Sequence, residues 1–290
     1  NAGILKLEGI SGIANNVRIV NNMFDGGFYN ILLHAGLVDN YGSGYEVDSN
    51  ICTNADYIGI HLNYFNANSI SYNSIYSRTS NGYSYVYNLA LGNGTVNEVI
   101  GNKLYLNRQA SATNVYSLYL SHLNKSVSNR ILVLNNEIRV NTNSTTTYAV
   151  YTHTSKFDFY HNSIYMTTPS GGGSGFHLYA CASNVKNNSI HCIGLLPFQF
   201  SSSSFISDYN NYYGNNFSLF TWQNSTGQDS YSVSIVPPYM NTANSLELSN
   251  YNMFQCPRLP NILKDINGAY RTSITTMGAY SVPFWEGYNL

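Results

Sequence analysis

Charged residues are scarce in this chain of 290 residues. Lysine, arginine, aspartate and glutamate make up 9% of it, and the formal net charge is −1. A soluble protein usually carries about a quarter of such residues. A nucleic-acid partner needs a basic surface that displaces counterions, and an anionic membrane attracts polybasic segments. The composition therefore argues against both partners and predicts a surface built from uncharged polar residues.

The sequence also lacks metal-binding motifs and long apolar runs. Cys52, Cys181, Cys192 and Cys256 show no CxxC spacing, so we expect no metal and no cofactor, and interpret them as buried small apolar residues. The sequence leaves open whether Cys181 and Cys192 form a disulfide, because spacing alone does not determine pairing. No apolar run approaches the roughly 20 residues that cross a bilayer. Because the chain starts at Asn1 without methionine, we interpret it as a mature or excised fragment of a larger polypeptide or assembly.

Helical periodicity is missing too, and an internal repeat takes its place. An octet recurs that contains asparagine, one further residue and then usually a large apolar residue, as in VRIVNNMF (17–24), NEVIGNKL (97–104) and ILVLNNEI (131–138). The aligned asparagines are Asn22, Asn50, Asn73, Asn102, Asn136, Asn162, Asn188 and Asn211. Their mean separation is 27 residues, and this irregular period is typical of a solenoid whose turns carry loops of variable length.

Apolar and polar residues alternate within each octet. Three residues before the asparagine stand Ile19, Val47, Ile70, Val99, Val133, Phe159 and Val185, and two residues after it stand Phe24, Cys52, Ile75, Leu104, Ile138, Ile164, Ile190 and Tyr213. A period of two indicates strands with one buried face. Further strands are expected at 29–36, 59–63, 88–92, 116–122, 148–153, 175–180 and 197–201.

Short strands in a repeating turn predict an all-β fold, a right-handed parallel β-helix of about eight turns and about 40 Å in length. Residues 1–214 would form the repeats, and residues 215–290 the last turns and a C-terminal cap of the same domain. An antiparallel sandwich is the alternative, but its hairpins would need more Asn-Gly or Asp-Gly pairs. We expect the repeated asparagines to occupy corners in the left-handed or bridge region and to stack as an amide ladder.

The repeats over about 15–214 resemble those of the pectate-lyase-like superfamily. The segments DINGAYR (265–271) and MGAY (277–280) resemble the C-terminal closure of secreted bacterial right-handed β-helix proteins. The matching residues are Asp265, Gly268, Arg271, Gly278, Ala279 and Tyr280, with Met277 in place of the usual isoleucine or leucine. This resemblance implies an exported protein, of the kind found on Bacteroidetes-type bacteria, whose apolar rod end is covered by a cap that includes Trp222, Pro237, Pro238, Phe254, Pro257 and Trp285.

Two groups of outward residues are candidate sites. Arg18, Glu46 and Asp48 form the densest charged group and are weak catalytic candidates, with an exposed ion pair as the alternative interpretation. Aromatic rings on outward columns are candidates for glycan contact, with ordinary strand propensity as the alternative. These residues are Tyr76, Tyr105, Tyr165, His191 and Tyr119.

The expected function is a non-catalytic structural or binding module of a secreted or cell-surface protein. It would contact polysaccharide or other surface proteins, without nucleic acid and without membrane insertion. Two alternatives remain open: a polysaccharide lyase or hydrolase, the lyase with calcium, and a trimeric adhesin or phage-spike-like protein.

Overall fold

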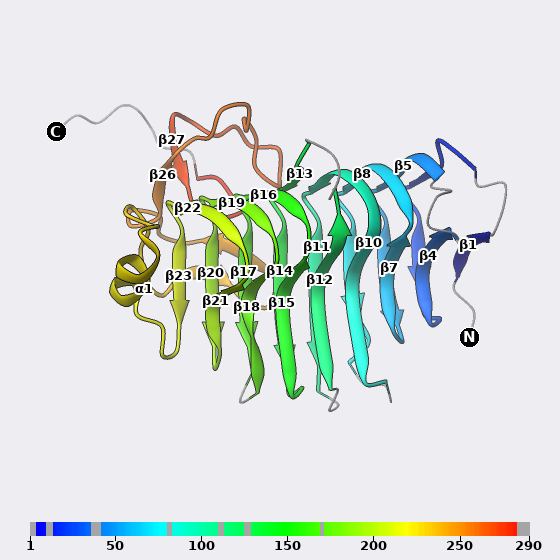
Figure 1. Cartoon of the computed structure of the whole chain (residues 1–290), viewed down its shortest axis with the longest axis horizontal. Helices are drawn as coiled ribbons and strands as arrows, with labels where there is room; N and C mark the ends of the chain where they lie inside the picture. Colours follow the sequence, from blue (N-terminus) through cyan, green and yellow to red (C-terminus); the bar gives the residue numbers. More distant parts are fainter. Residues whose placement is uncertain are drawn as a thin grey trace.

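The structure, a computed structural model, describes residues 4–9, 14–35, 42–79, 83–109, 113–124, 129–168 and 171–282. The chain coils into a parallel β-solenoid of about seven turns, with its core enclosed by three sheets that we name A, B and C (Figure 1). Each full turn adds one strand to each sheet. The predicted all-β parallel β-helix is therefore confirmed.

The strands of the three sheets follow one another in chain order. Sheet A contains β1 (Leu5–Gly9), β4 (Tyr29–Ala35), β7 (Ile58–Asn63), the first part of β10 (Tyr85–Ile100), β12 (Asn114–Leu123), β15 (Thr146–His153), β18 (Gly172–Tyr179) and β21 (Leu196–Ser201). Sheet B contains β2 (Arg18–Val20), β5 (Gly42–Asp48), β8 (Phe65–Ser71), the second part of β10, β13 (Ile131–Leu134), β16 (Lys156–Tyr160), β19 (Ala182–Lys186) and β22 (Ser204–Asp208). Sheet C contains β3 (Met23–Asp25), β6 (Ile51–Ala55), β9 (Ser74–Ser77), β11 (Lys103–Arg108), β14 (Glu137–Thr142), β17 (Ser163–Thr167), β20 (Ser189–Ile193) and β23 (Asn211–Gly214).

The predicted asparagine stack lies at the corner between sheets B and C. Asn136 shows its pattern: the backbone N–H and the side-chain Nδ2 both donate to Oδ1 of Asn162 at 2.9 Å, and Nδ2 also donates to the carbonyl of Val99. The members are Asn22, Asn50, Asn73, Asn102, Asn136, Asn162, Asn188 and Asn210. Each amide thus satisfies backbone groups of neighbouring turns that would otherwise be buried without partners.

The last member of the stack is Asn210, which corrects the expected Asn211. Asn188 donates to Oδ1 of Asn210, whereas the side chain of Asn211 bonds the backbone of Ile235. Since a slip of one residue exchanges the two faces of a strand, Tyr212 and not Tyr213 fills the core there, opposite Ile190. The sequence ISDYNNYY (206–213) does not distinguish the two registers, because both Asn and Tyr occur as consecutive pairs.

The left-handed corner residue precedes each stacked asparagine, which corrects the expectation that the asparagine itself takes this conformation. The φ angle is 54° at Asn135, 52° at Tyr72 and 66° at Gly101. The further members of this column are Asn21, Ser49, His161, Asn187 and Tyr209. One residue therefore turns the chain, and the next sends its amide inward to the stack.

The helix α1 (Leu219–Thr226) covers the C-terminal end of the core. Its Trp222 packs on Phe198 and Phe205, with ring centroids 5.0 and 5.9 Å away. Indole Nε1 donates to Oδ2 of the buried Asp229 at 2.8 Å. Trp222 thus belongs to the cap that the sequence predicts (Figure 1).

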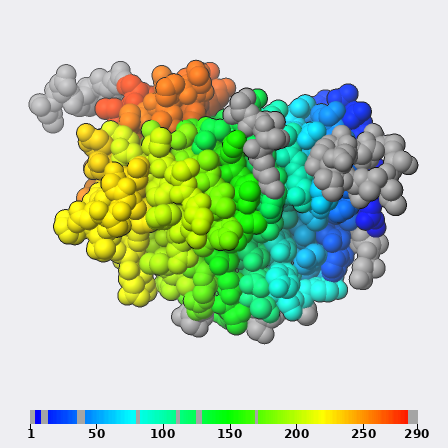
Figure 2. Space-filling model, in the orientation of Figure 1, coloured from blue at the N-terminus to red at the C-terminus, as the bar shows by residue number. Residues whose placement is uncertain are grey.

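The segment 237–282, which we name the C-terminal arm, lies along the flank of the solenoid and does not close its end. The arm contains β24 (Tyr239–Asn241), β25 (Ser245–Leu248), β26 (Gln255–Pro257) and β27 (Ile274–Thr276). It turns back over the C-terminal half of the coil (Figures 1 and 2). The side chains of Asn135 and Asn187 donate to the carbonyls of Lys264 and Pro257 at 2.8 Å. The expected capping role of Pro237, Pro238, Phe254 and Pro257 is therefore corrected to a role on the flank, while Trp285 lies outside the described residues.

The residues that resemble the C-terminal closure motif hold the arm together. Asp265 accepts from the backbone N–H groups of Asn267, Ala269 and Ser281. Arg271, which is 1% exposed, donates to the carbonyls of Thr276, Gly278 and Ala279, and to Oδ1 of Asn135 at 2.9 Å. Asn135 of the octet ILVLNNEI is thus one of the residues that join the solenoid to the arm.

Candidate functional site

The charged candidates lie on sheet B of the first two turns. Arg18 and Glu46 are paired in register, with Nε 2.7 Å from Oε2, and their side chains are 68% and 32% exposed. Asp48 accepts from the hydroxyl of Ser49 at 3.0 Å. An exposed pair of this kind contributes at most ~1 kcal/mol, so the interpretation as a surface ion pair accounts for what these residues do here.

The aromatic candidates of sheet C lie three residues after the stacked asparagines, in one outward column. Strand pairing places Tyr76 beside Tyr105, Tyr105 beside Arg139, Arg139 beside Tyr165, and Tyr165 beside His191. Sequence reasoning missed Arg139, although its place three residues after Asn136 is the signal that would have found it. The repeat thus sets these five side chains of the column in a row on consecutive turns.

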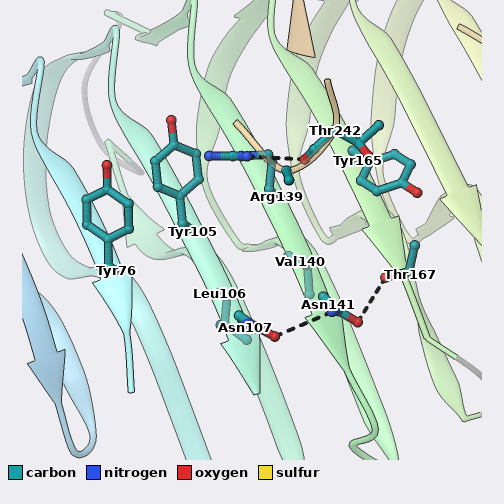
Figure 3. A pocket seen from close by; sticks show the side chains of 11 residues that line it. Tyr76, Tyr105, Leu106, Asn107, Arg139, Val140, Asn141, Tyr165, Thr167 and Thr242 are labelled. Atoms are coloured by element: carbon teal, nitrogen blue, oxygen red, sulfur yellow. Dashed lines mark hydrogen bonds between the residues drawn. The ribbon is translucent and has the colours of Figure 1, made fainter. Parts of the chain in front are cut away.

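A groove opens between this column and the arm. Its volume is about 410 Å³, and Figure 3 shows the three tyrosines and Arg139 along it. The lining residues are Tyr76, Tyr105, Leu106, Asn107, Arg139, Val140, Asn141, Tyr165, Thr167, Thr242 and Ala243. Since Thr242 and Ala243 belong to the arm, the arm forms one wall of the groove.

Arg139 is fixed in place from three sides. Its Nε lies 3.0 Å from Oε1 of the fully buried Glu137, its Nη1 donates to the carbonyl of Thr242 at 3.1 Å, and its guanidinium carbon lies 3.7 Å from the centre of the Tyr105 ring. Glu137 also accepts from the hydroxyl of Tyr280 and from the backbone N–H of Leu246. The guanidinium charge is therefore balanced locally, and a planar donor group faces the groove.

Uncharged polar side chains line the groove below the rings. Asn141 donates to Oδ1 of Asn107 at 3.4 Å and accepts from the hydroxyl of Thr167 at 3.1 Å (Figure 3). Asn107 and Asn141 are exposed, so their amides remain accessible to a ligand. Burial raises the pKa of Tyr105 above its ordinary value, so its ring is neutral at physiological pH. The groove combines ring surfaces with amide and hydroxyl groups.

The two remaining candidates lie outside the groove. His191 continues the column but is 6% exposed, because Tyr239 of the arm covers it with the ring centroids 6.4 Å apart. Burial lowers the pKa of His191 to about 4. Tyr119 lies on sheet A, on a different face of the solenoid. The structure thus brings Tyr76, Tyr105 and Tyr165 together and separates His191 and Tyr119 from them.

Sheet A carries a second aromatic surface that sequence reasoning noted only at Tyr119. Tyr87 stacks on Tyr116 at 4.9 Å and 9°, and Tyr119 stacks on Tyr151 at 5.6 Å and 4°. The spacing of the repeat could have predicted this surface, because tyrosines occupy corresponding positions in successive strands of sheet A, as Tyr116 and Tyr148 do.

The described residues contain no cluster of three or more His, Cys, Asp or Glu side chains that could hold a metal. All four cysteines are free and buried, and desolvation raises the pKa of Cys52 and Cys256 to about 12. Cys181 and Cys192 are therefore not paired in this structure. Within the described ranges, no helix has the length and apolar character needed to span a membrane.

Comparison of the chain with protein-family models, with curated proteins and with solved structures gives no match.

Proposed function

We propose that this chain is a non-catalytic β-solenoid module that binds uncharged polysaccharide in the groove between sheet C and the arm. The observation that carries the proposal is the row Tyr76, Tyr105, Arg139 and Tyr165 above the amides of Asn107 and Asn141. Aromatic rings offer apolar surface to the faces of sugar rings, and amides and guanidinium groups bond their hydroxyls. The row spans four turns at about 4.8 Å each, which suits an elongated ligand.

The local charge balance supports an uncharged ligand over an acidic one. Arg139 is the only charged side chain that lines the groove among the described residues, and Glu137 lies 3.0 Å from it. A uronic-acid polymer would bring a negative charge on every residue, and the groove offers it no net counter-charge, because Glu137 already balances Arg139. Neutral glycans need no counter-charge.

Export to the cell surface or the medium is part of the proposal. The low charge and the many tyrosine, asparagine and serine residues support it, as does the resemblance of the repeats and the arm motif to secreted pectate-lyase-like β-helix proteins. Surface labelling of intact cells that make the full-length protein tests this part, and labelling only after lysis would contradict it.

The binding experiment compares oligosaccharides from neutral polysaccharides with those from polyuronates by calorimetry. We expect binding of at least one neutral series, weakened roughly tenfold, or ~1.4 kcal/mol, by Tyr76→Ala. Tyr179→Ala is the matched control, because Tyr179 on sheet A is 42% exposed and Tyr76 is 41% exposed. Equal losses in the two variants, or a preference for polyuronates, would contradict the proposal.

The catalytic alternative has its own test. A polysaccharide lyase or hydrolase would release unsaturated products or reducing ends from the polymers that bind, and a lyase would lose this activity with EDTA. We expect neither product, and we expect binding to be unchanged by EDTA. If cleavage occurs, Glu46→Ala and Asp48→Ala tell whether those carboxylates carry it.

Analytical ultracentrifugation tests the trimeric alternative, since a mass near 32.3 kDa excludes it for this chain.

A further inference from the structure

A small pocket interrupts the aromatic surface of sheet A. Along one outward column the neighbours are His61, Ala90, Tyr119, Tyr151 and His177 in strand order. In the next outward column, the residue of the same turn is Gly92, which lies between Asn63 and Ser121 of the neighbouring turns. Because both outward residues of this turn are small, a pocket of about 220 Å³ opens above them, which we name the Ala90 pocket.

Two ring faces look across the Ala90 pocket along the solenoid axis. Tyr119 has its far face against Tyr151, at 5.6 Å and 4°, and His61 has its far face against Tyr29, at 6.0 Å and 20°. Their near faces therefore point toward Ala90, two turns or about 9.6 Å apart. One ring placed between them would lie about 4.8 Å from each, which is close to the spacing of the stacked rings elsewhere on sheet A.

A side wall and a polar rim complete the pocket. Tyr87 stands at 77° to Tyr119 and at 88° to Tyr57, so three tyrosine rings meet nearly at right angles. At the rim, Asn93 donates to Oδ1 of Asn63 at 3.0 Å. Buried Nδ1 of His61 has no hydrogen-bond partner among the described residues. The pocket thus offers ring faces together with amide groups at its rim that a hydroxyl could bond.

We propose that the Ala90 pocket is a second binding site, which takes one pyranose ring of an uncharged sugar between Tyr119 and His61. Among the described residues, no Asp, Glu, Lys or Arg side chain lines it, so an ionic ligand has no counter-charge there. A quaternary ammonium would suit the ring faces but has neither a hydrogen to donate nor a lone pair to accept at the amides of Asn63 and Asn93 on the rim. A sugar hydroxyl can do both.

This site is independent of the groove. The pocket lies on sheet A and the groove on sheet C, so the failure of one leaves the other standing. Its size admits a single ring, whereas the groove follows four turns. Together the two sites would let one module hold a polymer along its flank and a chain end on another face.

Filling the pocket with a native-like ring is the direct test. Ala90→Tyr extends a column in which Tyr119 and Tyr151 already stack, so we expect the variant to fold with unchanged or higher thermal stability. Methyl glycosides of neutral hexoses serve as probes in ligand-observed NMR. We expect Ala90→Tyr to abolish saturation transfer to at least one glycoside that the parent protein binds, and to leave oligosaccharide binding in the groove unchanged.

A reciprocal variant distinguishes the pocket from the groove, and a second probe distinguishes a sugar from a cationic ligand. Tyr76→Ala should weaken oligosaccharide binding and leave the glycoside signal intact. Should Ala90→Tyr fail to fold, Tyr119→Ala removes one wall, and loss of the glycoside signal in that variant supports the site equally. Absence of any glycoside signal in the parent protein, persistence of the signal in the Ala90→Tyr variant, or binding of tetramethylammonium without glycosides would overturn the proposal.

Discussion

At the residue scale, the asparagine of each repeat is a connector between turns. An interior amide accepts two hydrogen bonds from the asparagine before it and donates to the asparagine after it, as Asn136 does between Asn102 and Asn162. The left-handed residue before it turns the chain at the corner. Where that residue is Asn135, its side chain also bonds Arg271 and Lys264 of the arm. Two adjacent asparagines thus serve different partners.

Replacing one interior member tests the stack. Asn136→Ala leaves the buried N–H and Nδ2 groups of Asn102 without their acceptor, at roughly 1–3 kcal/mol for each lost partner. We expect a loss of about 3 kcal/mol in the free energy of unfolding, measured with urea. Asn22→Ala is the control, because Asn22 is exposed and lies at the first position of the stack, where it donates to Asn50 and to the carbonyl of Val20. Comparable losses in both variants would show that the stack adds nothing beyond local bonds.

At the scale of elements, sheet C and the neighbouring corner enclose neutral histidines under the arm. Nε2 of His161, which is fully buried, lies 3.1 Å from the amide nitrogen of Asn187, so it accepts from that amide only while it is unprotonated. Desolvation, followed by the charge of Arg271, lowers the pKa of His161 well below its ordinary value. Desolvation also lowers the pKa of His191 to about 4.

These histidines predict acid sensitivity in a definite window. In the unfolded chain these two histidines bind protons near pH 6.5, whereas in the folded chain the pKa of His191 is about 4 and that of His161 is well below its ordinary value. Their contribution to stability is therefore full above pH 6.5 and falls as the pH drops toward 4. We expect a lower urea midpoint at pH 5 than at pH 7.5, with a smaller difference in His191→Gln. His61 and His177, whose pKa values burial also lowers, add to the effect in both proteins. An identical pH dependence in the variant would refute the role of His191.

At the scale of the whole molecule, the arm turns a regular coil into a surface with a groove. Arg271 is its main anchor, since it donates to arm carbonyls and to Asn135 on the solenoid. Burial lowers its pKa to about 10, so it stays charged at neutral pH. The coil itself is held by parallel pairing between successive turns, in which the arm takes no part.

Arg271→Ala should therefore release the arm and spare the coil. We expect limited proteolysis to cut within residues 237–282 at least tenfold faster, while the far-ultraviolet circular dichroism of the sheets is retained. Oligosaccharide binding should weaken too, because Thr242 and Ala243 leave the groove. Arg258→Ala is the matched control, since the side chain of this exposed arginine donates to the carbonyl of Arg271 and to no group of the solenoid among the described residues. Unchanged proteolysis in Arg271→Ala would contradict the anchoring role.

The sequence by itself determined the solenoid, because a period of two within strands and a period near 27 between turns are local patterns that each turn repeats. It also placed Tyr76, Tyr105 and Tyr165 in one column, since a shared offset from the stacked asparagines is enough. It could not fix the last turn, where consecutive Asn and Tyr pairs allow two registers, nor the course of the arm.

Only the tertiary structure decided which column residues face solvent. The arm covers His191 and adds a wall beside Arg139 through contacts between residues more than 100 positions apart, as between Arg139 and Thr242. No periodic pattern encodes such a contact, because the arm does not repeat. The repeating residue pattern of each turn predicts the coil, whereas the groove depends on where the one non-repeating segment, the arm, packs.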